Sequence, residues 1–209
     1  MLRRHRCSST QEGGSVQLNY TLANILTLSR FFIAPSVIVC VLADSGTAMH
    51  WAIILFAVGA LTDYFDGALA RRMGEETALG SYLDPLADKV LTTAAFVTFY
   101  MINVLPLWML AVIIVRDFGT TVLRSIASTS PRPLKTSMTA KWKTFLQMCF
   151  IIYALLMQWA VYNAPSPSLR VSAWNTLHSE YTYWVMFVIT LFTLYTAVEY
   201  LFHHYRKDR

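Results

Sequence analysis

Charged side chains are scarce in this 209-residue sequence: Asp, Glu, Lys and Arg make up 14% of it, whereas soluble domains average about 25%. Apolar residues reach 56%. This balance excludes a disordered chain and disfavours a soluble enzyme. The three cysteines, Cys7, Cys40 and Cys149, are scattered and give neither a disulfide framework nor a zinc-binding spacing. What remains is an integral membrane protein.

Six long apolar segments follow one another along the chain, each near the roughly 20 residues that cross a bilayer as a helix. No internal repeat and no second domain interrupts them. The pattern predicts an all-α integral membrane protein with six transmembrane helices and a single membrane domain over residues 18–209. The predicted segments are residues 28–43, 51–70, 85–103, 106–126, 145–162 and 181–202.

The N-terminal stretch differs from the rest of the chain. Residues 1–17 are first basic, then polar and rich in Gly and Ser. Polar residues precede the first apolar run, and no cleavage site of small residues follows, so a signal peptide is not indicated. We predict a flexible cytoplasmic tail over residues 1–17 and a short interfacial helix over residues 19–29.

Basic residues indicate the orientation in the membrane. Twelve Lys and Arg residues lie in the tails and connections on the side of the two termini, and Arg170 alone lies on the other side. Because basic residues remain on the cytoplasmic side, both termini are predicted to be cytoplasmic. The formal charge of +5 therefore indicates an anionic lipid surface and not nucleic acid. A bacterial inner membrane is the expected location, and a mitochondrial inner membrane is the alternative.

Four aspartates occupy positions where a membrane protein seldom places charge. Asp63 and Asp66 are three residues apart near the end of the second segment, and Asp84 and Asp88 are four apart at the start of the third. Residues at these spacings share a helix face, and the short connection makes the two helices antiparallel neighbours. Four converging carboxylates need cations to stay ionised, and an all-oxygen cluster suits Mg²⁺ or Mn²⁺. Since one Mg²⁺ seldom takes four carboxylates, a site for two ions is predicted.

Other interpretations of these aspartates stay open. Asp84 precedes a proline and could serve as a helix N-cap, while Asp63 or Asp66 could pair with Arg71. A divalent-cation transporter is a further alternative, because intramembrane carboxylates also mark ion pathways. A pathway needs polar groups across the whole membrane, and the half of the membrane away from the two termini offers only two acidic residues, Asp44 and Glu180, both in loops.

The run from Asp63 to Asp88 resembles the signature of the CDP-alcohol phosphotransferase family. It reads Asp-x2-Asp-Gly-x2-Ala-Arg-x8-Gly-x3-Asp-x3-Asp and matches at every defined position. The resemblance implies six transmembrane helices with a site facing the cytoplasm, and a homodimer. It also implies a reaction that depends on Mg²⁺ or Mn²⁺, in which CDP-diacylglycerol gives its phosphatidyl group to an alcohol and CMP is released.

The resemblance assigns roles by position. Asp63, Asp66 and Asp84 would bind the metals, and Asp88 would bind one metal and act as general base on the acceptor hydroxyl. The residues expected to contact CDP-diacylglycerol are Asn24, Gly67, Arg71, Thr77 and Gly80.

Four basic residues outside the signature would suit a phosphate on the acceptor. They are Arg116, Arg124, Lys141 and Lys143. The segments around them resemble the family members that use glycerol 3-phosphate, which we predict as the acceptor. The Arg116–Asp117 pair also resembles the cardiolipin-forming members, so phosphatidylglycerol is the alternative acceptor. Arg116 could instead have a structural role, paired with Asp117 or Glu199.

These assignments predict that Asp63→Asn, Asp84→Asn and Asp88→Asn each abolish turnover, because each removes a charge on which the metals or the base depends. Arg124→Ala should raise the KM for the acceptor more than the KM for the donor. Steady-state kinetics of purified variants test both statements. Full activity of Asp88→Asn would rule out the assigned base.

Overall fold

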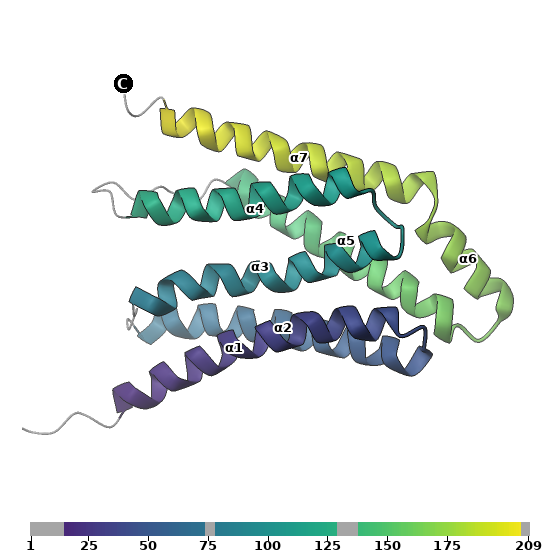
Figure 1. Cartoon of the computed structure of the whole chain (residues 1–209), viewed down its shortest axis with the longest axis horizontal. Coiled ribbons are helices and arrows are strands. Elements are labelled where there is room, and N and C mark those ends of the chain that lie inside the picture. The colour runs from purple at the N-terminus through teal and green to yellow at the C-terminus, as the bar shows by residue number, and fades with distance from the viewer. Residues whose placement is uncertain (1–14, 74–77, 129–137, 206–209) are drawn as a thin grey trace, which may run out of the picture.

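The computed structural model describes the backbone of residues 15–73, 78–128 and 138–205, and the side chains of 29–62, 89–122, 138–139 and 141–199. Within these ranges every regular element is an α-helix (Figure 1). The helices are α1 (Ser15–Leu42), α2 (Gly46–Met73), α3 (Ala78–Met101), α4 (Leu107–Ser128), α5 (Met138–Asn163), α6 (Pro167–Leu177) and α7 (Glu180–Tyr205).

The predicted all-helical fold is confirmed, and a long helix covers each of the six predicted apolar segments. The start of the chain differs from the prediction. Residues 19–29 form part of α1 and not a separate interfacial helix, because no glycine or proline occurs between Ser15 and Pro35 to end the helix. Residues 15–17 of the predicted tail begin α1, and the rest of that tail lies outside the described residues.

One helix was not predicted. α6 has only 11 residues and lies within the connection that follows α5. Its start carries an ordinary helix signal: the Ser166 side chain accepts a hydrogen bond from the backbone N–H of Leu169, and Pro167 occupies the first turn. The length falls well short of a bilayer span, which is why a search for long apolar segments passed over it.

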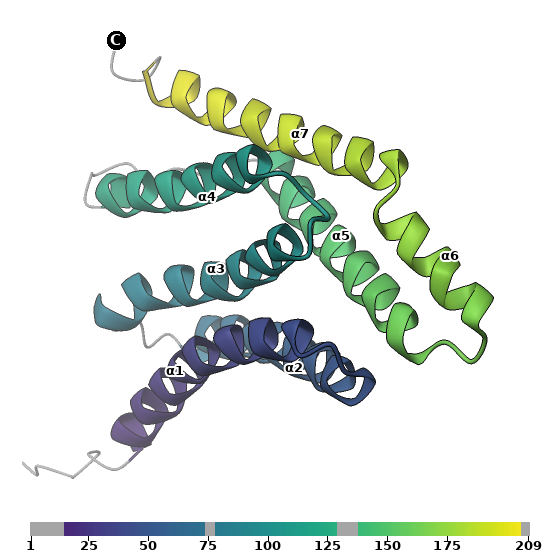
Figure 2. The same ribbon diagram turned by 45° about the vertical axis from the view of Figure 1, so that its right-hand side comes forward.

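α1 begins and α7 ends at the same end of the bundle, which we call the termini end (Figure 1). The connections α1–α2 and α3–α4 lie at the opposite end, where α6 also lies. α5 crosses the bundle obliquely (Figure 2), and it contacts α2 and α3 as well as α6 and α7. An even number of long helices thus returns the chain to the end where it started.

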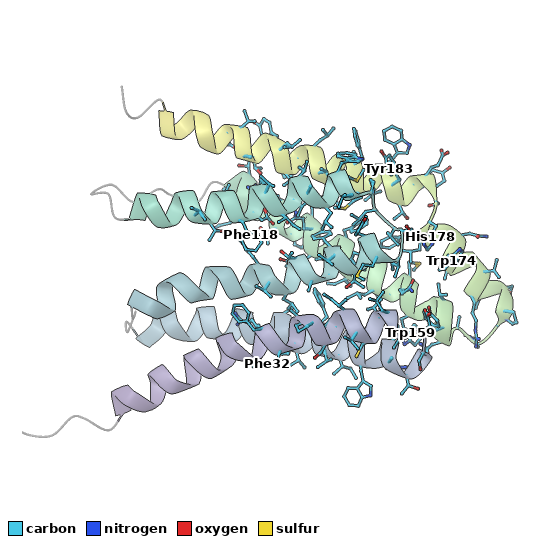
Figure 3. The ribbon with its side chains drawn as sticks, in the orientation of Figure 1. Phe32, Phe118, Trp159, Trp174, His178 and Tyr183 are labelled. Atoms are coloured by element: carbon cyan, nitrogen blue, oxygen red, sulfur yellow. The ribbon has the colours of Figure 1, made fainter. Side chains whose placement is uncertain are left out.

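The connections at the opposite end are closely tied. Asp44 and Asn103 adopt left-handed backbone conformations just after α1 and α3, with φ of 47° and 60°, as Asp and Asn often do after a helix. Tyr162 donates to the Asp44 carboxylate at 2.7 Å, and His178 Nε2 donates to the Ile102 carbonyl at 3.0 Å. Figure 3 shows Trp159, Trp174 and His178 together in this region. Tyr162 on α5 and His178, the residue after α6, therefore fix the turns after α1 and α3.

The outer faces of the bundle are strongly apolar. Phe32 on α1 is 73% exposed, Val115 on α4 72% and Val188 on α7 61%. Two stretches of the described residues, Lys141–Asn163 and Pro167–Glu199, are long and apolar enough to cross a membrane. Exposed apolar surface on this scale is typical of contact with lipid.

Gly59 allows α2 to approach its neighbours closely. A Cβ added there would lie 2.8 Å from Leu91 Cδ2 on α3 and 3.4 Å from Ile33 Cγ2 on α1. A methyl group at this position would therefore require the Leu91 side chain, which is 3% exposed, to shift where three helices meet.

Gly59→Ala should give a free energy of unfolding about 1–3 kcal/mol lower than Gly119→Ala does, because its methyl group overpacks the contact with Leu91 while both variants gain the same helix propensity. Gly119→Ala is the control, since a Cβ there meets nothing within 4 Å, and it should be neutral or stabilising by up to about 1 kcal/mol. Thermal unfolding in detergent measures both. Combining Gly59→Ala with Leu91→Ala should cost less than the sum of the two changes; strict additivity would contradict the contact.

Candidate active site

The backbone places the four signature aspartates on two helices that pack against each other. Asp63 and Asp66 lie in the second half of α2, and Asp84 and Asp88 lie in the first half of α3. Asp63 is ten residues before the end of α2 and Asp88 ten residues after the start of α3. At about 1.5 Å per residue, both lie roughly 15 Å from those helix ends, so they share one level of the bundle.

The side chains of the signature lie outside the described residues, so their contacts stay predictions. This holds for the four aspartates and for the residues predicted to bind the donor. Of the donor-binding set, Asn24 lies on α1, Gly67 and Arg71 lie on α2 and Gly80 lies on α3, while Thr77 falls outside the described backbone.

A buried carboxylate on α4 forms the centre of the described polar groups. Asp117 is 8% exposed. Its Oδ1 accepts from Arg116 Nη1 at 3.1 Å and from the ammonium group of Lys143, which reaches it from α5 and is itself 2% exposed. The Asp117 carboxylate is therefore the counterion of two cations.

Further polar contacts extend this arrangement to two more helices. Lys89 on α3 donates to the Asp117 carbonyl and to the Thr121 hydroxyl. Arg116 Nη2 donates to Thr196 on α7 at 2.8 Å. We call Lys89, Arg116, Asp117, Thr121, Lys143 and Thr196 the Asp117 cluster. Its members come from four helices, and Lys89 directly follows Asp88 in the sequence.

α5 begins at Met138, seven residues before the predicted apolar segment, so its first turns include Lys143 of the cluster. The backbones of α4 and α5 make no close approach within the described ranges, and the long side chain of Lys143 connects the two helices. Lys141, two positions earlier, is exposed. Two residues apart on a helix is more than half a turn, so the two lysines point to different sides.

The structure thus separates the four residues predicted to bind the acceptor. It brings Arg116 and Lys143 together on one carboxylate, leaves Lys141 on the surface, and does not describe the side chain of Arg124. Of the two partners considered for Arg116, Asp117 is the one observed. Glu199 instead accepts from Thr139 of α5 at 2.7 Å.

Two buried donors near the cluster have no hydrogen-bond partner among the described residues. They are Arg116 Nε and the amide Nε2 of Gln147, which lies one turn after Lys143 on α5. Buried N–H groups in folded proteins are almost always paired, so each such donor calls for an explanation. A bound ligand with oxygen acceptors would supply one.

Sequence reasoning missed Lys89 and Thr196, and it assigned no role to Gln147. The sequence did indicate a role for Lys89, because a lysine just inside an apolar segment needs a polar partner. Nothing in the sequence distinguished Thr196, since threonines are common on the buried face of a membrane helix.

Comparison with known proteins identifies the family of this chain. The CDP-alcohol phosphatidyltransferase family matches residues 20–198. The chain belongs to this family. Over 131 residues it is 39% identical to a Mycobacterium tuberculosis protein named "Probable phosphatidylglycerophosphate synthase", and this match covers 60% of the chain and 61% of the relative.

Two further relatives are named CDP-diacylglycerol–glycerol-3-phosphate 3-phosphatidyltransferase. The Bacillus subtilis protein is 34% identical over 149 residues, covering 66% of this chain and 77% of its own length. The Cereibacter sphaeroides protein is 35% identical over 143 residues, covering 66% and 65%. The match to the mycobacterial relative spans about three fifths of that protein.

The residues of the signature fit the divalent ions expected of this phosphatidyltransferase family. Their four carboxylates are hard oxygen donors of the kind that Mg²⁺ and Mn²⁺ prefer, and their backbone positions lie on adjacent helices. Among the side chains that are described, no group of three His, Cys, Asp or Glu residues comes together. A metal site in the described part of the chain therefore has no support away from the signature.

The two lysines of α5 provide a matched test of the cluster. Lys143→Met should destabilise the protein by about 2 kcal/mol, because it removes a buried, charge-assisted hydrogen bond to Asp117. Lys141→Met changes an exposed residue and should stay within about 0.5 kcal/mol. Thermal unfolding in one detergent compares the two. Equal effects would mean that Lys143 does not hold the buried position described here.

Proposed function

We propose that the chain transfers the phosphatidyl group of CDP-diacylglycerol to glycerol 3-phosphate and releases phosphatidylglycerophosphate and CMP. Family membership supports the reaction type, and the names of the relatives support the two substrates. The observation that carries the choice of acceptor is the buried pair of cations, Arg116 and Lys143, on a single carboxylate.

The charge of this group favours an anionic acceptor. Two cations and one carboxylate leave a net positive charge in a buried position, where ions are costly unless compensated. Arg116 Nε adds a donor with no partner among the described residues. A phosphate group would supply both the negative charge and the oxygen acceptors, and guanidinium and ammonium groups are its usual partners.

The type of phosphate favours glycerol 3-phosphate over phosphatidylglycerol. A phosphate monoester carries about −1.5 to −2 charges at pH 7, whereas the diester of phosphatidylglycerol carries only one. The doubly charged monoester gains more from a site with excess positive charge. Phosphatidylglycerol stays as the alternative acceptor that an experiment must exclude.

The proposed chemistry takes place on the signature residues. Asp88 accepts the proton of the primary hydroxyl of glycerol 3-phosphate, whose oxygen then bonds to the phosphorus that carries the diacylglycerol. The bond from this phosphorus to the bridging oxygen breaks, and CMP leaves with that oxygen and its electron pair. Two Mg²⁺ or Mn²⁺ ions on Asp63, Asp66, Asp84 and Asp88 would neutralise the pyrophosphate and the departing CMP.

The same proposal includes the membrane arrangement. The six long helices span the membrane, and the termini end faces the cytoplasm, since it carries the connections rich in Lys and Arg. Residues 18–209 form the membrane domain of a protein of a bacterial inner membrane, preceded by the cytoplasmic tail. The donor's acyl chains then stay in the bilayer while its headgroup meets Asn24, Gly67, Arg71, Thr77 and Gly80. The resemblance to the family also supports a homodimer.

The test is release of CMP by the detergent-purified protein with CDP-diacylglycerol and Mg²⁺. Glycerol 3-phosphate and phosphatidylglycerol are offered in separate reactions, with no acceptor as the blank and Asp84→Asn as the inactive control. We expect CMP only with glycerol 3-phosphate, and none after removal of divalent ions with EDTA. Release with phosphatidylglycerol alone would establish the cardiolipin-forming reaction instead.

A further inference from the structure

The buried face of α5 changes from charged to apolar over two helical turns. Lys143, Gln147 and Ile151 follow one another at four-residue intervals on this face, with exposures of 2%, 4% and 0%. Phe150, 3% exposed, lies beside Ile151. Gln147 is therefore the last polar side chain of this face before the apolar core, counted from the Asp117 cluster.

The amide group of Gln147 is buried with a hydrogen-bond donor that is unsatisfied in the described part of the chain. Its Nε2 is buried and has no hydrogen-bond partner within the described residues. A buried donor left unsatisfied costs about 1–3 kcal/mol. Because buried donors in folded proteins are almost always paired, the amide points to an acceptor that the described residues do not supply, such as an oxygen atom of a ligand.

The position of the amide restricts what that ligand group can be. Gln147 lies one turn from Lys143, and side chains at this spacing start about 5–6 Å apart. If the cations of the Asp117 cluster hold the acceptor's phosphate, the amide reaches the carbon chain next to it. An uncharged donor at that distance suits a hydroxyl group better than a second anion.

We infer that Gln147 is a further substrate-binding residue, whose Nε2 donates a hydrogen bond to the secondary hydroxyl of glycerol 3-phosphate. This inference rests on the proposed function. The primary hydroxyl gives up its proton in the reaction, whereas the secondary hydroxyl does not react and needs a lasting partner when it is buried. A site built to bind a substrate hydroxyl rejects the analogue that lacks it.

The test pairs a change in the protein with a change in the substrate. 1,3-Propanediol monophosphate keeps the phosphate and the reacting primary hydroxyl of glycerol 3-phosphate but lacks the secondary hydroxyl. The wild-type protein should prefer glycerol 3-phosphate by about tenfold or more in kcat/KM, the factor expected for one buried hydrogen bond. In Gln147→Met the preference should fall to about twofold or less, through a lower kcat/KM for glycerol 3-phosphate alone.

Gln158→Met is the matched control. Gln158 lies on the same helix with 2% exposure, and its amide Oε1 also has no partner within the described residues. It matches Gln147 in burial and in an unpaired amide atom, but it is eleven residues further along the helix, about 16 Å from Gln147 and far from the cations. This variant should keep the wild-type preference, and thermal unfolding should confirm that both variants fold.

A wild-type preference that persists in Gln147→Met would overturn the inference, as would an equal loss of kcat/KM for both acceptors. Either result would leave the proposed function intact. A wild-type protein that releases no CMP with glycerol 3-phosphate would instead refute the proposed function, whatever the variants do.

Discussion

The carboxylate of Asp117 balances two cations inside a bundle that offers charges little water. Burying an ion costs several kcal/mol unless partners replace its hydration. Arg116 and Lys143 share this single acceptor, and without it the two would repel each other. Lys143 extends from α5, and Lys89 extends from α3, to contact Asp117 on α4, so this residue links three helices. Its neighbour Arg116 links α4 to α7 by a hydrogen bond to Thr196.

The same balance connects the architecture with the proposed reaction. The cluster keeps more positive than negative charge on its three central residues, and this excess would hold a substrate phosphate. Lys89, the residue that follows Asp88 on α3, donates to the Asp117 carbonyl on α4. The helix that carries two of the predicted metal ligands is thereby tied to the helix that carries the cations. In the proposed reaction the signature aspartates bind the donor through the metals, and the cations of the cluster bind the acceptor. The two substrates must then meet within bonding distance.

Much of this arrangement could be predicted from the sequence. Six long helices followed from six apolar segments, because hydropathy over about 20 residues is a strong signal. α6 was missed because 11 residues give no such signal, although Ser166 and Pro167 marked its start. The pairing of Arg116 with Asp117 was one of two partners that the sequence allowed. Which lysine of α5 is buried depends on how that helix is rotated, and tertiary packing decides it. The metal-binding roles of Asp63, Asp66, Asp84 and Asp88 stay predictions.

We propose that Asp117 and Lys143 act as one unit in binding the acceptor. A double-mutant cycle of Asp117→Asn and Lys143→Met, read on the KM for glycerol 3-phosphate, tests this most directly. We expect each single variant to raise this KM about tenfold, and the double variant to be at most about twofold worse than the weaker single variant. The KM for CDP-diacylglycerol should stay unchanged throughout. Effects that multiply in the double variant, or that fall equally on both substrates, would contradict the claim.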